Sequence, residues 1–291
     1  MLLQLIVSGI LLGGIYALLS VGLSLMLGVS KFLNFAHGDF VMVGMYMAFI
    51  CYQNWGVNSY LSWPIVTLFA AALGVIVFAF SRLTIGQGNT LNQILLTLGL
   101  SMVLQNVMLL LYKSDYKSVP NALSGSIQVQ EIFISTGLLI TFIIALCITA
   151  VFLCFIQFTS LGRAMRAVGE DRHASQLMGI PVGKVDLVTF CLGITMACIS
   201  GSLMMSVYPV TPSVGSGYNL IAWVTVVLGG LGHLQGALLS ALLIGICETV
   251  SGFYLGADLR QVVYFVVFLL VLIVRPQGLF SGFNMKKVKR S

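Results

Sequence analysis

Charged side chains are scarce in this sequence. Asp, Glu, Lys and Arg together make up 8% of the residues, whereas hydrophobic residues make up 59%. A soluble domain carries about 25% charged residues, so most of this protein's surface does not face water. Several uncharged stretches reach or exceed the roughly 20 residues that cross a bilayer. The composition excludes an ordinary soluble domain and predicts a polytopic integral membrane protein.

The residues that usually build catalytic or metal sites are also few and scattered. His37, His173 and His233 lie far apart, and the six cysteines fall in or beside apolar segments without the spacing of metal ligands. Only Glu248 lies deep inside a predicted membrane segment, which disfavours a proton-coupled carrier because such carriers bury ionisable relay groups. We therefore expect no catalytic site, no metal site and no bound cofactor in this chain.

Two glycine-containing stretches resemble nucleotide-binding motifs, but neither matches one. "GGLGHLQG" (Gly229–Gly236) lacks the flanking strand and α/β setting of a dinucleotide loop. "GIPVGKV" (Gly179–Val185) has one residue too few between its glycines and no Ser or Thr after the lysine. The net charge of +6 gathers largely in one central loop and the C-terminal tail, a pattern that reports membrane orientation. The sequence therefore indicates neither an ATP site nor a nucleic-acid partner.

The long apolar runs predict a single all-α domain over residues 1–291, a polytopic membrane helix bundle of about 8–9 segments. Leu2–Leu27 has no basic start and is too long for a signal peptide, so we interpret it as a retained helix. Leu220–Tyr254 is too long for one crossing and should form a broken or re-entrant hairpin. The other predicted segments are Leu33–Cys51, Leu61–Phe80, Leu91–Tyr112, Ile132–Phe158, Val185–Val207 and Leu259–Val274.

The basic residues predict the orientation. They concentrate in the loop 159–184 and in the tail 275–291, and both should be cytoplasmic. Counting back from the loop places the N-terminus outside. The tail is cytoplasmic only if Leu220–Tyr254 enters and leaves on one face, which puts Gly229–Gly236 at the inner end of the hairpin.

Two polar, glycine-containing stretches interrupt the apolar pattern: "NFAHGDF" at Asn34–Phe40 and "GGLGHLQG". Asn34 or Asp39 could cap a helix at the interface. Alternatively, each stretch marks a broken helix that lines a transport path, with Asn34 and His37 as hydrogen-bonded groups that stabilise the break. The candidate pathway residues are Asn34, His37, Gly38, Asp39, Gly229, Gly230, Gly232, His233 and Gly236.

The central loop is patterned more strongly than a connector needs to be. Leu161–Val185 is expected to form two short helices broken at Gly169 and ended by Gly179, with Glu170 and Asp171 at the start of the second. Its small apolar faces are typical of a segment that docks in a groove of a cytoplasmic partner. The alternative is an amphipathic loop held at the interface by anionic lipid.

Four motifs, in this order, resemble one family: "NFAHGD", "GRAMRAVGEDRHASQLMGI", "VVLGGLGHLQGALLSALLIG" and "RPQGLF". Together they are similar to the LivH-type permeases of branched-chain amino acid ABC importers, and the likeness covers almost the whole chain. It implies a multi-pass protein of the bacterial cytoplasmic (inner) membrane that forms half of a translocation pathway with a second homologous permease. Two cytoplasmic ATPase subunits would use ATP and Mg, and an extracytoplasmic binding protein would deliver the substrate.

The same resemblance makes the central loop an ATPase-coupling segment related to the motif E-A-A-x-x-x-G. Ala174, Ser175 and Gly179 match its second, third and last positions, whereas His173 replaces the glutamate. The candidate coupling residues are Gly162, Arg163, Arg166, Gly169, Glu170, Ala174, Ser175 and Gly179.

Three alternatives stay open at this point. Close relatives of the family carry urea or short amides, although the length and short N-terminus fit the amino acid branch. An autonomous secondary carrier is disfavoured by the patterned loop, and an intramembrane enzyme is disfavoured by the missing acid–base or metal cluster.

Overall fold

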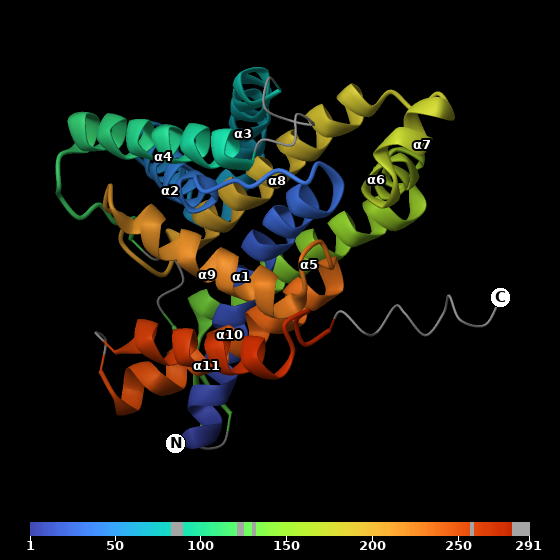
Figure 1. Cartoon of the computed structure of the whole chain (residues 1–291). Coiled ribbons are helices and arrows are strands. Elements are labelled where there is room, and N and C mark those ends of the chain that lie inside the picture. Colours follow the sequence, from blue (N-terminus) through green and yellow to red (C-terminus); the bar gives the residue numbers. More distant parts are fainter. Residues whose placement is uncertain (83–89, 121–124, 130–131, 257–258, 281–291) are drawn as a thin grey trace.

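A computed structural model describes residues 1–82, 90–120, 125–129, 132–256 and 259–280. The described residues form a bundle of eleven helices with one pair of short strands (Figure 1). The helices are α1 Leu2–Val29, α2 His37–Trp55, α3 Ser59–Ser81, α4 Thr90–Tyr112, α5 Thr136–Phe158, α6 Ser160–Glu170, α7 Arg172–Leu177, α8 Val182–Met204, α9 Val214–Gly229, α10 Leu234–Tyr254 and α11 Arg260–Val274. The strands β1 (Ser126–Val129) and β2 (Ile132–Ser135) pair antiparallel, with Ser126 opposite Ser135.

Six of the helices in the described ranges are long and apolar enough to cross a membrane, and α9 and α11 are shorter apolar helices. The chain is therefore an all-α, multi-pass membrane protein, as its composition predicts. α1, α2 and α8 form the buried centre, and α3, α4 and α5 lie at the periphery with many exposed apolar side chains. Such exposed faces suit contact with lipid or with another membrane subunit.

Close helix contacts in the centre depend on residues without side chains. Gly9 and Gly13 of α1 lie against the backbone of α10, where an added Cβ would come within 2.6 Å of the Ile246 Cα and 2.7 Å of the Leu242 Cα. In lipid, apolar burial gives little drive for helices to associate, so close backbone packing takes over that role. These two glycines explain why α10 can lie so tightly along α1.

Residues 30–36 are not helical and run back into the bundle from the end of α1. The Phe32 ring packs on Phe190 of α8 with centroids 4.9 Å apart, and the Asn34 Nδ2 lies 3.9 Å from the Met26 sulfur. His37, the first residue of α2, reaches the carbonyl oxygen of Leu19. Leu19 precedes Val29 by a length of helix that rises roughly 15 Å, so α2 begins well inside the bundle.

The predicted hairpin is confirmed. Leu220–Tyr254 belongs to α9, of 16 residues, and α10, of 21 residues, which are joined by a turn at residues 230–233. α9 is too short to cross a bilayer by itself, whereas α10 is long enough. The hairpin thus combines one short helix with one full-length helix.

Three details of the prediction are wrong. The segment predicted from Leu33 starts its helix at His37, and the segment predicted from Ile132 starts at Thr136 because 132–135 form β2. The break in the central loop falls at Asp171 and not at Gly169, because the Asp171 side chain caps α7. Glu170 is accordingly the last residue of α6 and does not begin the second helix.

Of the two interpretations left open for Asn34–Phe40, the structure does not support the helix cap. Neither Asn34 nor Asp39 caps this helix, since its N-cap residue is Ala36, which makes no side-chain cap hydrogen bond. Much of the basic tail predicted to be cytoplasmic, including Lys286 and Arg290, lies outside the described residues.

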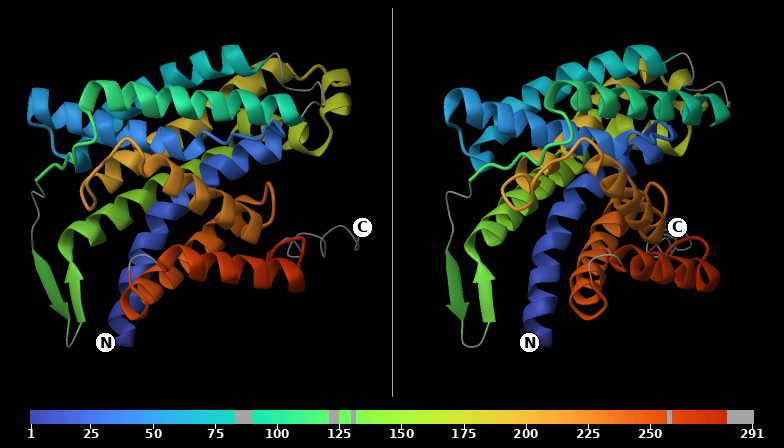
Figure 2. Two further views of the ribbon diagram at one scale, coloured as in Figure 1. Left: turned by 60° about the vertical axis from the view of Figure 1, so that its left-hand side comes forward. Right: turned by 90° about the vertical axis from the view of Figure 1, so that its left-hand side faces the viewer.

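The two ends of the bundle are distinct. The strands β1 and β2 project from the same end as the N-terminus in both views of Figure 2, and α6 and α7 lie away from that end (Figure 1).

In a cysteine-free chain, we expect a membrane-impermeant maleimide to label Tyr116→Cys in intact cells, and to label Leu177→Cys and Gln235→Cys only after permeabilisation. All three positions are exposed, so labelling depends only on the side of the membrane on which each cysteine lies. Labelling of position 235 from outside would contradict the hairpin orientation.

Candidate functional site

Asn34 and His37 are fully buried and bonded to the protein backbone. The Asn34 Oδ1 accepts a hydrogen bond from the Ala36 N–H at 3.0 Å, which closes a turn just before α2. The His37 Nε2 lies 3.1 Å from the Leu19 carbonyl oxygen. Because a carbonyl oxygen only accepts, Nε2 carries the proton and donates it. Both side chains thus bond to backbone near the break between α1 and α2, whereas the His37 Nδ1 is buried without a hydrogen-bond partner.

Asn219 of α9 joins this break from the other side. Its Nδ2 donates to the Phe35 carbonyl oxygen at 2.6 Å, and its Oδ1 accepts from the Gly38 N–H at 3.3 Å. Gly38 packs directly against the backbone of Asn219, where a Cβ would collide. Its role is therefore close packing of α2 on α9, and it sits inside a regular helix.

A polar stripe on α4 completes the surroundings of this segment. Gln93, Thr97, Ser101 and Gln105 recur at four-residue spacing, which places them on one face of the helix. The Gln93 Oε1 accepts from the Leu33 N–H at 3.3 Å, and the Gln105 Nε2 donates to the Asp39 Oδ1 at 2.8 Å. Two polar contacts of α4 are thus made with residues 33–39, and at its end Tyr112 stacks on Tyr46 of α2 with ring centroids 4.7 Å apart.

Sequence reasoning missed the stripe and Asn219. The signal was present, because four polar residues at helical spacing in an apolar helix predict a face turned toward the bundle. Asn219 carried a weaker sequence signal, since a single Asn in an apolar segment does not show which backbone groups it will bond to.

The second predicted pathway stretch lies elsewhere. Gly229–Gly236 occupies the far end of α9 from Asn219, a length of helix of roughly 15 Å. The turn is tight: Gly232 has φ +79° and would place a Cβ 2.8 Å from the Gly28 Cα. The C-terminal segment also reaches it, because the Leu279 N–H donates to the Leu228 carbonyl oxygen at 2.8 Å. The two predicted stretches therefore contact opposite ends of α9 and do not meet.

A cavity of about 870 Å³ brings this turn together with the central loop. It is lined by the ends of α1 and α5, by α6 and by the start of α10, so it opens at the end of the bundle away from the N-terminus. Six residues predicted for two different roles share its wall: Arg166, Gly169, Glu170, Gly232, His233 and Gly236. Lys31 and Phe280 also line it.

The central loop is held in shape by side-chain caps. The Thr159 Oγ1 accepts from the Gly162 N–H at 3.0 Å, and the Asp171 Oδ1 accepts from the N–H groups of Ala174 and His173 at 2.9 and 2.8 Å. These backbone bonds, with Ala174 the stronger influence, hold the pKa of the Asp171 carboxyl below its usual range. The loop is therefore a defined pair of helices.

Some of the remaining predicted coupling residues anchor α6 to α5, and others lie on α7 or in the turn that follows it. Arg163 and Arg166 donate to the carbonyl oxygens of Phe158 and Gln157 at 3.4 and 3.3 Å, which ties α6 to the end of α5. Ser175 is buried, and Ala174 is exposed on α7. Gly179 has φ +80°, a left-handed conformation that side-chain-bearing residues resist.

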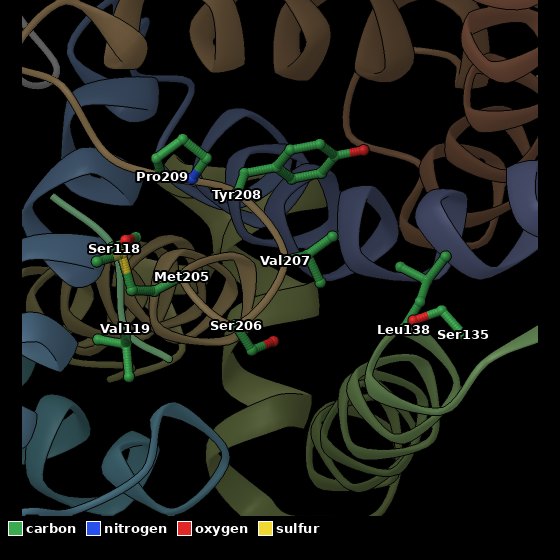
Figure 3. A pocket seen from close by; sticks show the side chains of 9 residues that line it. All are labelled: Ser118, Val119, Ser135, Leu138, Met205, Ser206, Val207, Tyr208 and Pro209. Atoms are coloured by element: carbon green, nitrogen blue, oxygen red, sulfur yellow. The ribbon is translucent and has the colours of Figure 1, made fainter. Parts of the chain in front are cut away.

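A smaller pocket of about 260 Å³ lies near the ends of α4 and α8 and the start of α5. Figure 3 shows its lining residues, which come from three separate stretches of chain: Ser118, Val119, Ser135, Leu138 and Met205–Pro209. It contains none of the predicted site residues. Across the described ranges, His, Cys, Asp and Glu side chains form no group suited to hold a metal ion.

The comparison with protein families matches residues 5–272 to the permease components of branched-chain amino acid transport systems. The chain belongs to this family. It is 32% identical to the high-affinity branched-chain amino acid transport permease BraD of Pseudomonas aeruginosa over 98% of both chains. It is 30% identical to LivH of Escherichia coli K12 over 98% of this chain and 97% of that protein. No solved structure gives a significant match.

The chain is also 26% identical to the probable branched-chain amino acid transport permease LivH of Methanocaldococcus jannaschii, over 97% of this chain and 93% of that protein. All three relatives are therefore matched over nearly their whole length. The resemblance carried by the four sequence motifs is confirmed.

We expect Asn219→Ala to lower the unfolding free energy of the permease by about 1–3 kcal/mol, because it leaves the Phe35 carbonyl and the Gly38 N–H unpaired inside the bundle. Asn106→Ala is the matched control, since the exposed Asn106 bonds only to the Met102 carbonyl of its own helix. Denaturation in detergent micelles measures both variants against wild type. Equal stability of the two variants would contradict the role of Asn219.

Proposed function

We propose that this chain is a permease subunit of a binding-protein-dependent ABC importer for branched-chain or related amino acids. It forms half of the translocation pathway in a bacterial cytoplasmic membrane, beside a second homologous permease. Two ATPase subunits supply the energy from ATP and Mg, and an extracytoplasmic protein delivers the substrate. The chain itself binds neither ATP nor a cofactor. Membership of the family over nearly the whole chain is the observation that carries this proposal.

The helix pair α6–α7 is the ATPase-coupling segment in this proposal. Leu177 and Met178, at the end of α7, are 76% and 83% exposed. Two neighbouring apolar side chains held open to water by a capped, charged segment are typical of a docking contact. α6 and the α9–α10 turn line the same cavity, and Gly169 of α6 and Gly232 of the turn both pack on Gly28 of α1, so α1 connects α6 to the turn.

The stretches Asn34–Asp39 and Gly229–Gly236 flank the pathway in this proposal, at two different depths. Asn34 and His37 bond to backbone of their own chain, His37 through Nε2 alone, and Asp39 accepts from Gln105. Side chains already bonded in this way shape a path and do not offer strong substrate ligands. Selectivity then rests mainly with the binding protein.

Two alternatives are decided by transport assays. A permease for urea or short amides would have the same architecture. An autonomous carrier would transport without an ATPase, and nothing in its mechanism would require the exposed Leu177 and Met178.

Co-expression with the transport genes encoded beside it tests the proposal. We expect the chain to co-purify with a second permease and two ATPase copies, and the reconstituted complex to import leucine, isoleucine or valine only with ATP and the binding protein. Urea uptake without amino acid uptake would establish the first alternative. Transport by the isolated chain would establish the second.

Gly179→Val should abolish ATP-driven uptake while leaving membrane insertion intact. Nothing lies within 4 Å of a Cβ at this position, so the substitution acts only through the φ of +80°, which valine adopts at a cost of roughly 1–3 kcal/mol. Gly183→Val is the matched control, because a Cβ there also meets open space and its φ is ordinary for a helix. Normal uptake by Gly179→Val would contradict the coupling assignment.

His37→Ala should lower the maximal uptake rate more than it changes the substrate concentration for half-maximal uptake. It removes the bond to the Leu19 carbonyl and so loosens the start of α2, without removing a ligand. Uptake measured over a range of leucine concentrations separates the two effects. A changed substrate preference at an unchanged maximal rate would make His37 a substrate ligand.

A further inference from the structure

Arg172 and Asp186 form an ion pair between α7 and α8. The Arg172 Nη1 donates to the Asp186 Oδ1 at 3.1 Å, and its Nη2 bonds to the Asp186 Oδ2. Each guanidinium nitrogen thus meets its own carboxylate oxygen, a two-pronged geometry that fixes orientation as well as distance. Arg172 is the first residue of α7, and Asp186 lies in the first turns of α8.

Ser30 adds a third element to this pair. Its hydroxyl donates to the Asp186 Oδ1 at 2.9 Å, and it is the residue that follows α1 and opens the non-helical segment 30–36. The Asp186 side chain is 3% exposed, whereas that of Arg172 is 32% exposed. One buried carboxylate therefore connects the exposed coupling helix, the start of α8 and the chain that leads to Asn34 and His37.

The pair is distinct from the other ion pairs of the described residues. Lys117–Asp115 joins neighbours in an exposed loop at 3.3 Å, and Arg260–Glu248 joins α10 to α11 at 3.7 Å. Exposed pairs contribute little to stability, whereas removing one partner of a buried pair leaves an uncompensated charge. Arg172–Asp186 is the pair among them that attaches α7 to a membrane helix.

A second contact limits how α6 can move. Gly169 packs on the end of α1, where a Cβ would lie 2.8 Å from the Gly28 carbonyl oxygen. α6 is therefore seated on α1, and α7 is tied by Arg172 to α8 and to Ser30. A displacement of α7 that keeps the ion pair must carry Asp186 and Ser30 with it.

We propose that the Arg172–Asp186–Ser30 cluster is the latch that transmits movement of the coupling helix to α8 and to the segment 30–36. Arg172 and Asp186 are positioning residues: they touch neither ATP nor substrate. The inference rests on the proposed function, because it takes α7 to be the contact with the ATPase. Breaking the latch lets the ATPase close without moving the pathway.

The experiment uses the assembled transporter, reconstituted with its ATPases and its leucine-loaded binding protein. It measures ATP hydrolysis and leucine uptake in the same vesicles and compares their ratio among Arg172→Lys, Asp186→Asn and Ser30→Ala. Lys184→Gln is the matched control, since Lys184 is an exposed cation on the same segment, outside the three ion pairs of the described residues.

We expect Arg172→Lys and Asp186→Asn to keep hydrolysis near the wild-type rate and to lower leucine imported per ATP by roughly tenfold, within the usual range of coupling between two sites. Ser30→Ala should lower it less, because the ion pair remains. Lys184→Gln should match wild type. The exchanged pair Arg172→Asp with Asp186→Arg should recover most of the ratio, which a purely structural role would not predict.

Wild-type ratios in the three single variants would overturn the latch while leaving the proposed function intact. Lowered ratios that the exchanged pair does not recover would also contradict it, because the paired contact between positions 172 and 186 would then not be the cause. If Asp186→Asn fails to assemble, Arg172→Lys and Ser30→Ala decide the outcome. A wild-type chain that binds no ATPase would overturn the proposed function and the latch together.

Discussion

Backbone polar groups buried in a membrane protein have to find partners within the protein, because lipid offers none. The non-helical segment 30–36 places this demand at the centre of the bundle. Asn34, Gln93 and Asn219 each supply a side-chain partner to its backbone or to the first turn of α2. α4 and α9 each contribute one of these partners, so both helices are bonded to the segment that precedes α2.

The general architecture could be predicted from the sequence because lipid imposes a simple rule on length and polarity. Apolar runs located nearly all the membrane helices, and the glycine-rich interruption located the turn between α9 and α10, whose Gly230 and Gly232 both have positive φ. The details that could not be predicted depend on tertiary partners. Asp171 ends α6 by capping α7, although Gly169 is the weaker helix former, because a side-chain bond to two N–H groups outweighs local propensity.

The candidate site was predicted only in its parts. His37 and Asp39 were recognised as polar residues in an apolar setting, but their partners Leu19 and Gln105 lie on other helices. The meeting of Gly232 with Gly28 is also a long-range contact that no local pattern contains. What the sequence could not show was that the central loop and the α9–α10 turn share a cavity, because this requires α1 to end between them.

The segment that follows α11 is attached to the bundle at two points. The Leu279 N–H bonds to the Leu228 carbonyl oxygen, and Gly278 packs on Gly230. The chain therefore leaves Phe280 beside the cavity and near α6. A bulky affinity tag or fluorescent protein joined directly after Phe280 would lie beside the cavity, close to the face where the ATPase is proposed to bind. The N-terminus lies at the far end of α1, whose 28 residues rise roughly 40 Å, so a fusion at that end leaves the coupling face free for assembly.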